Sequence, residues 1–171
     1  MVKWKTMNKK AKNLILDIIK FFIYSSIFYA ILYQFKSFLI DIVTYQSYLM
    51  LKIVLSDVTR LDNTISISNI TFLVEEPCTG IMTIALILGF VATVSKNLKE
   101  YIFGSVFCAL LIYIGNIIRI IIIAVFTNNF GNGEYVHDNV SFIIIPLSIF
   151  VTILIWYKIR EKLFIDIKLD G

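Results

Sequence analysis

Long runs of apolar residues alternate with short polar segments along this chain of 171 residues. Four runs are long enough to cross the roughly 30 Å of hydrocarbon in a bilayer, which takes about 20 helical residues. They predict transmembrane helices over about residues 18–40, 80–95, 101–127 and 140–157. The second is the shortest. We therefore expect an all-α, polytopic membrane protein with about four transmembrane helices, forming a single domain over residues 1–171.

A long connection over residues 41–77 follows the first predicted span. It begins with apolar residues at helical spacing between Tyr45 and Leu55, a pattern typical of an amphipathic helix that lies at the membrane interface. A re-entrant segment over residues 42–56 is the alternative interpretation.

The rest of this connection has a different period. Polar and apolar residues alternate over Thr64–Ser68, and Asn69–Val74 continues the pattern. Such alternation is typical of β-strands and predicts a small β-hairpin resting on the membrane. The second outer connection, residues 128–139, is shorter and polar, which predicts a loop.

Composition supports lipid as the solvent. The chain is 58% hydrophobic and 16% charged, with a mean hydropathy of +0.84, whereas a soluble domain is nearer half apolar and a quarter charged. The pI of about 9.0 comes from basic residues beside apolar runs, so it indicates topology and no nucleic-acid partner. The two cysteines have no spacing pattern, which excludes a disulfide framework and a zinc cluster. We expect no metal and no cofactor.

The basic residues predict the orientation. In a four-span topology, twelve of the sixteen lysines and arginines fall on one side, which the positive-inside rule makes cytoplasmic. These residues are Lys3, Lys5, Lys9, Lys10, Lys12, Lys20, Lys96, Lys99, Lys158, Arg160, Lys162 and Lys168. Both termini are then cytoplasmic and the two longer connections are extracytoplasmic. The first apolar run is too long for a cleavable signal peptide and has no cleavage site.

Arg119 is the residue that lipid should reject most strongly. It interrupts a run of isoleucines, about 12 Å from the outer end of its predicted span. An arginine near a helix centre costs about 2.5–3.5 kcal/mol on insertion scales. Asn116 lies one turn earlier on the same helix face. Arg119 is either a functional cation or a structural residue that pairs with a neighbouring helix.

Cys78 lies in Glu75–Gly80, where the first outer connection becomes the second span. Thr79 is a candidate N-cap for that span, and the positive end of the helix dipole favours a thiolate at Cys78. A single cysteine is most often an inert core residue, and Cys108, in the middle of an apolar run, fits that description.

His137 is the only histidine of the chain and precedes the fourth span. A lone histidine in a loop is usually just solvated. However, the predicted topology puts Cys78, Arg119 and His137 at or near the outer ends of the second, third and fourth spans.

These residues resemble the motifs of the exosortase and archaeosortase family of membrane cysteine transpeptidases. The family has a cysteine followed by a small or hydroxyl residue and a glycine, then Asn-x-x-Arg in a later span, then a histidine before the last span. This chain reads Cys78-Thr79-Gly80, Asn116-Ile117-Ile118-Arg119 and His137 in that order. The resemblance covers about residues 65–157, and the chain has fewer spans than many members.

The resemblance implies a reaction and a substrate class. Cys78 is expected to form a thioester with an exported protein, Arg119 to hold the thiolate or the oxyanion, and His137 to transfer protons. Asp138, the next residue, is a weaker candidate to orient His137. The substrates would carry a C-terminal sorting tail made of a short motif, a transmembrane helix and a basic cluster. A membrane lipid or an envelope component would be the acceptor.

Two other classes of function remain open from the residues. One is a non-catalytic membrane scaffold in which Arg119 is structural, and the other is a small transporter subunit in which Arg119 lines an anion path. The catalytic reading requires Cys78, Arg119 and His137 to converge in the folded protein.

Overall fold

The fold comes from a computed structural model that describes residues 9–68 and 70–165, so Lys3, Lys5 and Lys168 of the orientation argument lie outside the described residues. Five α-helices, three short strands and two other helical turns follow one another along the chain. In order they are α1 (Lys9–Tyr33), α2 (Lys36–Val54), β1 (Val58–Leu61), β2 (Thr64–Ile67), β3 (Ile70–Leu73), the 3-10 turn η2 (Glu76–Thr79), α3 (Ile81–Val94), α4 (Leu98–Phe130), α5 (Gly133–Arg160) and the π turn η3 (Glu161–Ile165).

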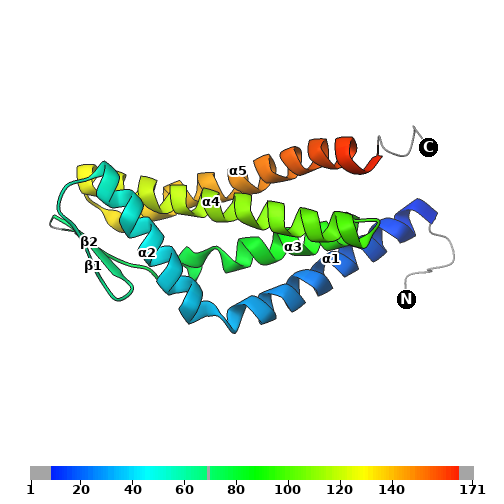
Figure 1. Cartoon of the computed structure of the whole chain (residues 1–171), viewed down its shortest axis with the longest axis horizontal. Helices are drawn as coiled ribbons and strands as arrows, with labels where there is room; N and C mark the ends of the chain where they lie inside the picture. The colour runs from blue at the N-terminus through cyan, green and yellow to red at the C-terminus, as the bar shows by residue number, and fades with distance from the viewer. Residues whose placement is uncertain (1–8, 69, 166–171) are drawn as a thin grey trace.

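Helices α1, α3, α4 and α5 run side by side in an elongated bundle, and α2 leaves the end of α1 at an angle to it (Figure 1). The start of α1, the α3–α4 turn and the end of α5 lie at one end, here named the lysine end. The sheet and the α4–α5 turn lie at the other, here named the sheet end. The described basic segments therefore gather at one end of the bundle, as the predicted topology requires.

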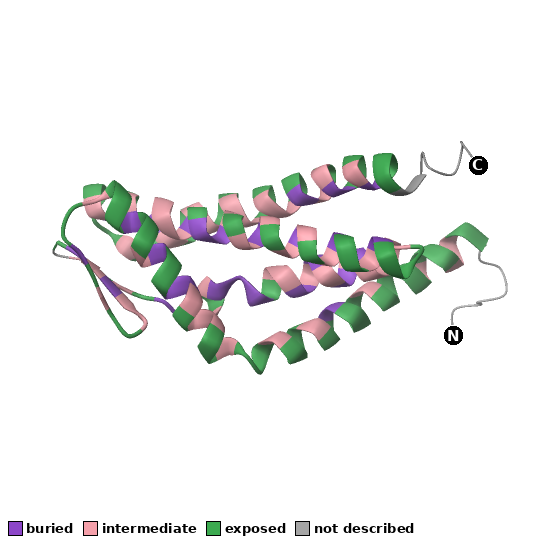
Figure 2. Ribbon diagram, in the orientation of Figure 1, coloured by how far each residue is buried: buried purple, intermediate pink, exposed green. Residues whose placement is uncertain are grey.

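Among the described residues, four helices are long and apolar enough to cross a membrane, namely α1, α2, α4 and α5. Exposed residues follow the outer faces of the helices (Figure 2), and many of them are large and apolar, such as Phe22 at 60% exposure and Phe142 at 82%. Exposed apolar surface on this scale matches a lipid solvent. The prediction of an all-α, polytopic membrane protein is confirmed.

The boundaries of the first predicted span were wrong. The apolar run over residues 18–40 is divided between α1 and α2 by a turn at Gln34 and Phe35. The amides of these two residues bond to carbonyls three residues back, at 3.2 and 3.0 Å, which tightens the chain out of the α-helix. Apolarity marks where a chain meets lipid, but it does not show a bend within one apolar run.

Helix α2 confirms the helix predicted in the first outer connection and begins earlier, at Lys36. It is one continuous helix, so residues 42–56 do not turn back as a re-entrant loop. Helix α2 meets the length and composition of a span, whereas α3, predicted to be one, has 14 residues and is only about 21 Å long.

The predicted hairpin is confirmed as β2 and β3, and β1 makes it a three-stranded antiparallel sheet in the order β1-β2-β3. Strand β1 was missed because its residues, Val-Thr-Arg-Leu, do not alternate in polarity. Ile65 and Ile67 of β2 are almost fully buried and pack in one cluster with Val43 of α2 and Ala124 of α4. The sheet therefore packs against α2 and α4 at this end of the bundle.

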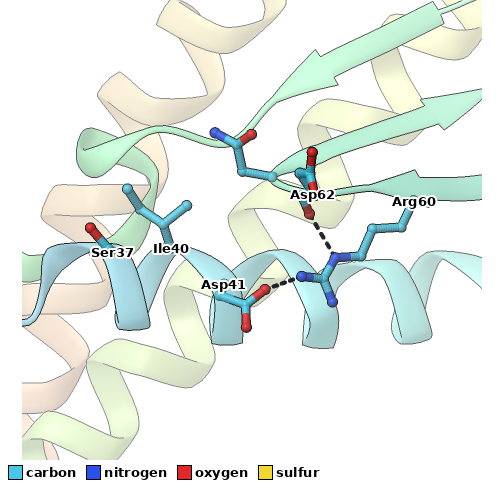
Figure 3. A pocket seen from close by; sticks show the side chains of 6 residues that line it. Ser37, Ile40, Asp41, Arg60 and Asp62 are labelled. Atoms are coloured by element: carbon cyan, nitrogen blue, oxygen red, sulfur yellow. Dashed lines mark hydrogen bonds and ion pairs between the residues drawn. The ribbon is translucent and has the colours of Figure 1, made fainter.

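Arg60 ties this sheet to α2 (Figure 3). Its guanidinium donates to the carboxylate of Asp41 on α2 and to the carbonyl of Asp62, the latter at 2.8 Å. A depression of about 550 Å³ beside this contact is lined by Ser37, Ile40, Asp41, Arg60, Asp62 and Asn63. Since Asp41 is 68% exposed, the ion pair orients the sheet more than it stabilises the fold.

The polar segment over residues 128–139 was predicted to be a loop, and this was wrong. Helix α4 continues to Phe130 and α5 begins at Gly133, which leaves a two-residue turn. Gly131 ends α4 with φ +68°, and the side chain of Asn132 accepts a bond from the amide of Tyr135 at the start of α5. Polar residues at a bilayer surface can continue a helix, because water satisfies their side chains.

Candidate active site

Cys78 lies in the 3-10 turn η2, which joins the sheet to α3. Its amide bonds to the carbonyl of Glu75 at 2.9 Å. Gly80 ends the turn in the left-handed conformation, with φ +74° and ψ +11°, and α3 begins at the next residue. Glycine suits this position because it adopts positive φ without the strain that a Cβ would cause.

Thr79 was predicted to be the N-cap of this helix, which was wrong by one residue, since Gly80 holds that position. The hydroxyl of Thr79 still accepts a bond from the amide of Ile81 at 3.3 Å and donates to the carbonyl of Glu76 at 2.6 Å. Thr79 therefore joins the 3-10 turn to the first amides of α3.

Helix α4 holds this turn through two side chains one helical turn apart. Asn116 donates to the carbonyl of Cys78 at 2.6 Å, and Nη2 of Arg119 donates to the carbonyl of Pro77 at 3.4 Å. A Cβ on Gly80 would lie 3.3 Å from Cγ of Asn116, so only a glycine leaves ordinary space there. The motif residues of η2 and α4 thus pack directly against one another.

Arg119 is buried, at 4% exposure. Within the described residues, no carboxylate lies within ion-pair distance of it, and its buried Nε–H has no acceptor. The side chain of Cys78 lines the same cavity as Arg119. A buried cation without a carboxylate needs another negative partner, and Cys78 is the group that can supply one.

Arg160 shows what a structural buried arginine looks like in the same protein. Its Nε donates to the carboxylate of Glu100 at 2.5 Å, and its Nη2 donates to the carbonyl of Val94 at 2.6 Å. Glu100 is 2% exposed. This pair joins α4 and α5 at the lysine end. Among the described residues, no carboxylate pairs with Arg119 in this way, so its surroundings differ from those of Arg160.

His137 lies in the second turn of α5, where the loop was predicted. Its side chain is 43% exposed, and Nδ1 lies 3.1 Å from a carboxylate oxygen of Asp138. Asp138, which sequence reasoning ranked low, is the hydrogen-bond partner of the imidazole within the described residues. This contact leaves Nε2 as the nitrogen available to other groups.

Cys78, Arg119 and His137 line one cavity of about 60 Å³ beneath the sheet, together with residues of α2, β2, β3 and α4. It can hold a few water molecules. No hydrogen bond joins the thiol, the guanidinium and the imidazole directly in the part of the chain that the structure describes. The three groups therefore face a shared space from three separate elements, η2, α4 and α5.

Comparison with known proteins gives the family. A family model for transmembrane exosortases matches residues 7–155. The chain belongs to the transmembrane exosortase family. It is 39% identical over 157 residues to the probable archaeosortase E of Methanocaldococcus jannaschii, covering 91% of this chain and 84% of that protein. It is 36% identical over 154 residues to the probable archaeosortase D of the same organism, covering 88% and 95%. No solved structure matches it.

Membership of the exosortase family confirms the resemblance inferred from the motifs. The sequence did not reveal that Asn116 binds the Cys78 carbonyl, or that Glu100 pairs with Arg160. Both are contacts between residues distant along the chain, 38 and 60 positions apart. For the Asn116 contact, the sequence did give one indication: Asn116 and Arg119 lie one turn apart on the same face of a helix.

Proposed function

We propose that this exosortase-family protein is a membrane cysteine transpeptidase. It cleaves the C-terminal sorting signal of exported proteins through a thioester on Cys78 and transfers them to a membrane lipid or an envelope acceptor. The observation that carries this proposal is the shared cavity, in which Cys78 meets a buried Arg119 that has no carboxylate partner in the described chain. Two relatives are named as probable archaeosortases, which supports the same class of reaction for this protein.

In the first half-reaction, the sulfur of Cys78 attacks a backbone carbonyl carbon of the substrate. Arg119 stabilises first the thiolate and then the oxyanion, and its charge acts strongly because the site excludes most water. The C–N bond breaks, and the leaving amine takes a proton from His137. The products are a thioester on Cys78 and the released sorting tail.

In the second half-reaction, a hydroxyl or amine of the acceptor attacks the thioester carbon. His137, now neutral, removes the proton from that nucleophile, and the C–S bond breaks to regenerate the thiolate. Asn116 and Gly80 take no part in bond making. They hold the Cys78 backbone against α4 while the thiol reacts.

The proposed orientation has the lysine end in the cytoplasm and the sheet end outside. The basic cluster of a sorting tail then stays inside, its transmembrane helix lies beside the bundle, and its short motif reaches the outer side near Cys78. This geometry suits a substrate that is still anchored in the membrane after export.

The decisive experiment replaces Cys78 with Ala. The substrate is an exported host protein that ends in one transmembrane helix followed by basic residues, and the readout is its mature form in membranes. We expect Cys78→Ala to abolish processing and Cys108→Ala to retain it, since Cys108 is a buried core thiol of α4. Both cysteines are free thiols, so Cys108→Ala is a matched control for Cys78→Ala.

Each other class of function predicts a different result. A scaffold or a transporter subunit with a structural Arg119 would leave processing intact in Cys78→Ala. The mass of the mature C-terminus separates transfer from hydrolysis, because transfer adds the acceptor whereas hydrolysis leaves a free carboxylate.

A further inference from the structure

A larger cleft adjoins the cavity that Cys78 lines, at the sheet end. This cleft has a volume of about 450 Å³ and lies between β3 on one side and the α4–α5 turn on the other. His137, Ile123, Phe72 and Leu73 line both the cavity and the cleft, so the two spaces adjoin. A segment bound along the cleft therefore lies against His137, which also lines the cavity of Cys78.

Strand β3 presents its free edge to this cleft. In the order β1-β2-β3, β3 pairs with β2 on one side, and no described strand pairs with its other side. All four residues of β3, which point to both faces of the sheet, line the cleft, while no residue of β1 or β2 does. A space that touches consecutive residues of one strand and avoids its neighbour runs along the edge of that strand.

The register shows which backbone groups face the cleft. The amide of Val74 bonds to the carbonyl of Asn63 at 2.9 Å, so Val74 points toward β2. Hydrogen-bonded and non-hydrogen-bonded positions alternate along an antiparallel pair. Phe72 therefore points toward β2 as well, whereas Thr71 and Leu73 direct their N–H and C=O groups outward. These four groups can form a ladder with an additional strand.

Thr127 supplies a second, independent observation from the opposite wall. Its side chain is 3% exposed and lines the cleft, and no described residue forms a hydrogen bond with its hydroxyl. Helical threonines commonly donate to the carbonyl four residues back, as Thr44 and Thr93 do here at 2.7 and 2.8 Å. A buried hydroxyl without a partner costs free energy, so Thr127 is suited to a ligand that enters the cleft.

We propose that the substrate segment next to the scissile bond binds in this cleft as a β-strand added to the free edge of β3. This inference rests on the proposed function, and it specifies how the peptide reaches Cys78. Thr71 and Leu73 bind alternate residues of the segment through their backbone groups, and Thr127 bonds to it from the other side. Recognition through main-chain bonds tolerates many side chains, with specificity left to alternate pockets.

Disulfide mapping tests this directly. Thr71→Cys is placed in a full chain that also carries Cys78→Ala and Cys108→Ala, and one cysteine is moved through the substrate segment preceding its transmembrane helix. The substrate is the exported, tail-bearing host protein named above. An added strand puts paired Cα atoms about 5.5 Å apart, within disulfide range. We expect a cross-link at the one substrate position that pairs with Thr71 and none at its immediate neighbours, whose side chains point to the other face.

Ser66→Cys is the matched control. Ser66 pairs with Thr71 on the same face, but β2 has partners on both sides, so its cysteine should form no such cross-links. Equal cross-linking at neighbouring positions, or none at any position, would overturn strand docking. If either pattern appears while the substrate stays uncleaved in Cys78→Ala membranes, strand docking fails and the transpeptidase proposal stands. If Cys78→Ala membranes process the substrate and the cross-link is confined to the paired position, strand docking stands and the proposed chemistry fails.

Thr127 gives a test that needs no cross-link. Thr127→Val keeps the shape and removes the hydroxyl, and one hydrogen bond corresponds to about a five-fold loss of processing at limiting substrate. Thr127→Ser should restore it. Processing by Thr127→Val at the wild-type rate would overturn the assigned contact and would favour another occupant, such as the acceptor lipid.

Discussion

The side-chain amide of Asn116 on α4 donates to the carbonyl oxygen of Cys78 at 2.6 Å. This bond couples the turn that carries the thiol to the helix that carries Arg119. Asn116 itself is 7% exposed, so its amide does not readily exchange this bond for one to water. The Cys78 backbone is therefore held by a residue 38 positions away in sequence.

Asn116→Leu should slow processing without preventing insertion. The substitution keeps the side-chain volume but leaves the Cys78 carbonyl without its donor, which costs about 1–3 kcal/mol for a buried group. Processing of the tail-bearing substrate and the rate of maleimide labelling at Cys78 measure the effect. Asn139→Leu, an exposed position on α5, is the control and should behave as wild type. Unchanged processing in Asn116→Leu would argue against this positioning role.

Arg119→Lys should impair processing although the charge is kept. The planar guanidinium reaches the Pro77 carbonyl and retains a further donor for the reacting atoms, whereas an ammonium is a point charge on a flexible stem. Arg160→Lys, at the lysine end, should process normally per folded molecule. Equal activity of the two variants would mean that only the charge of Arg119 matters.

The pair of Glu100 and Arg160 should govern stability instead of activity. Arg160→Met leaves a buried, unpaired carboxylate, and breaking a buried pair in this way costs about 3–5 kcal/mol. Thermal unfolding in detergent measures the loss. The double variant Glu100→Leu/Arg160→Met should recover most of it. A double variant as unstable as Arg160→Met alone would contradict this view of the pair.

Gly80→Ala should lower stability and processing together. An L-residue in the left-handed region costs about 1–2 kcal/mol, and the new methyl group would crowd Asn116 at 3.3 Å. Unfolding temperature and substrate processing report the two effects. An unchanged unfolding temperature and unchanged processing in Gly80→Ala would exclude both the backbone strain and the crowding against Asn116.

His137→Gln should reduce processing by about 10²-fold or more, the usual contribution of a general acid–base group. Asp138→Asn should have a much smaller effect, because Asp138 is 74% exposed and water competes for its bond. Single-turnover assays with the tail-bearing substrate measure both. A loss in Asp138→Asn as large as that in His137→Gln would make the carboxylate an essential partner.

Several features of the fold followed from the pattern of residues alone. Hydropathy predicted a polytopic helical protein, and alternation over residues 64–74 predicted the hairpin. These properties are local, because each depends on neighbours in sequence. The same local logic failed where one apolar run bends at Gln34, and where polar residues after Thr127 continue as helix. Neither hydropathy nor polarity reports the hydrogen bonds that end a helix.

The sequence by itself determined that this chain belongs in lipid, that its basic segments share one side, and that Cys78, Arg119 and His137 are the residues to examine. Only the tertiary structure decided that they line one cavity, that Arg119 has no carboxylate beside it in the described chain whereas Arg160 does, and that β3 has a free edge along the adjoining cleft. The physical reason is that hydropathy and charge act residue by residue along the chain. Convergence depends instead on how η2, α4 and α5 pack, and packing joins positions that are far apart in sequence.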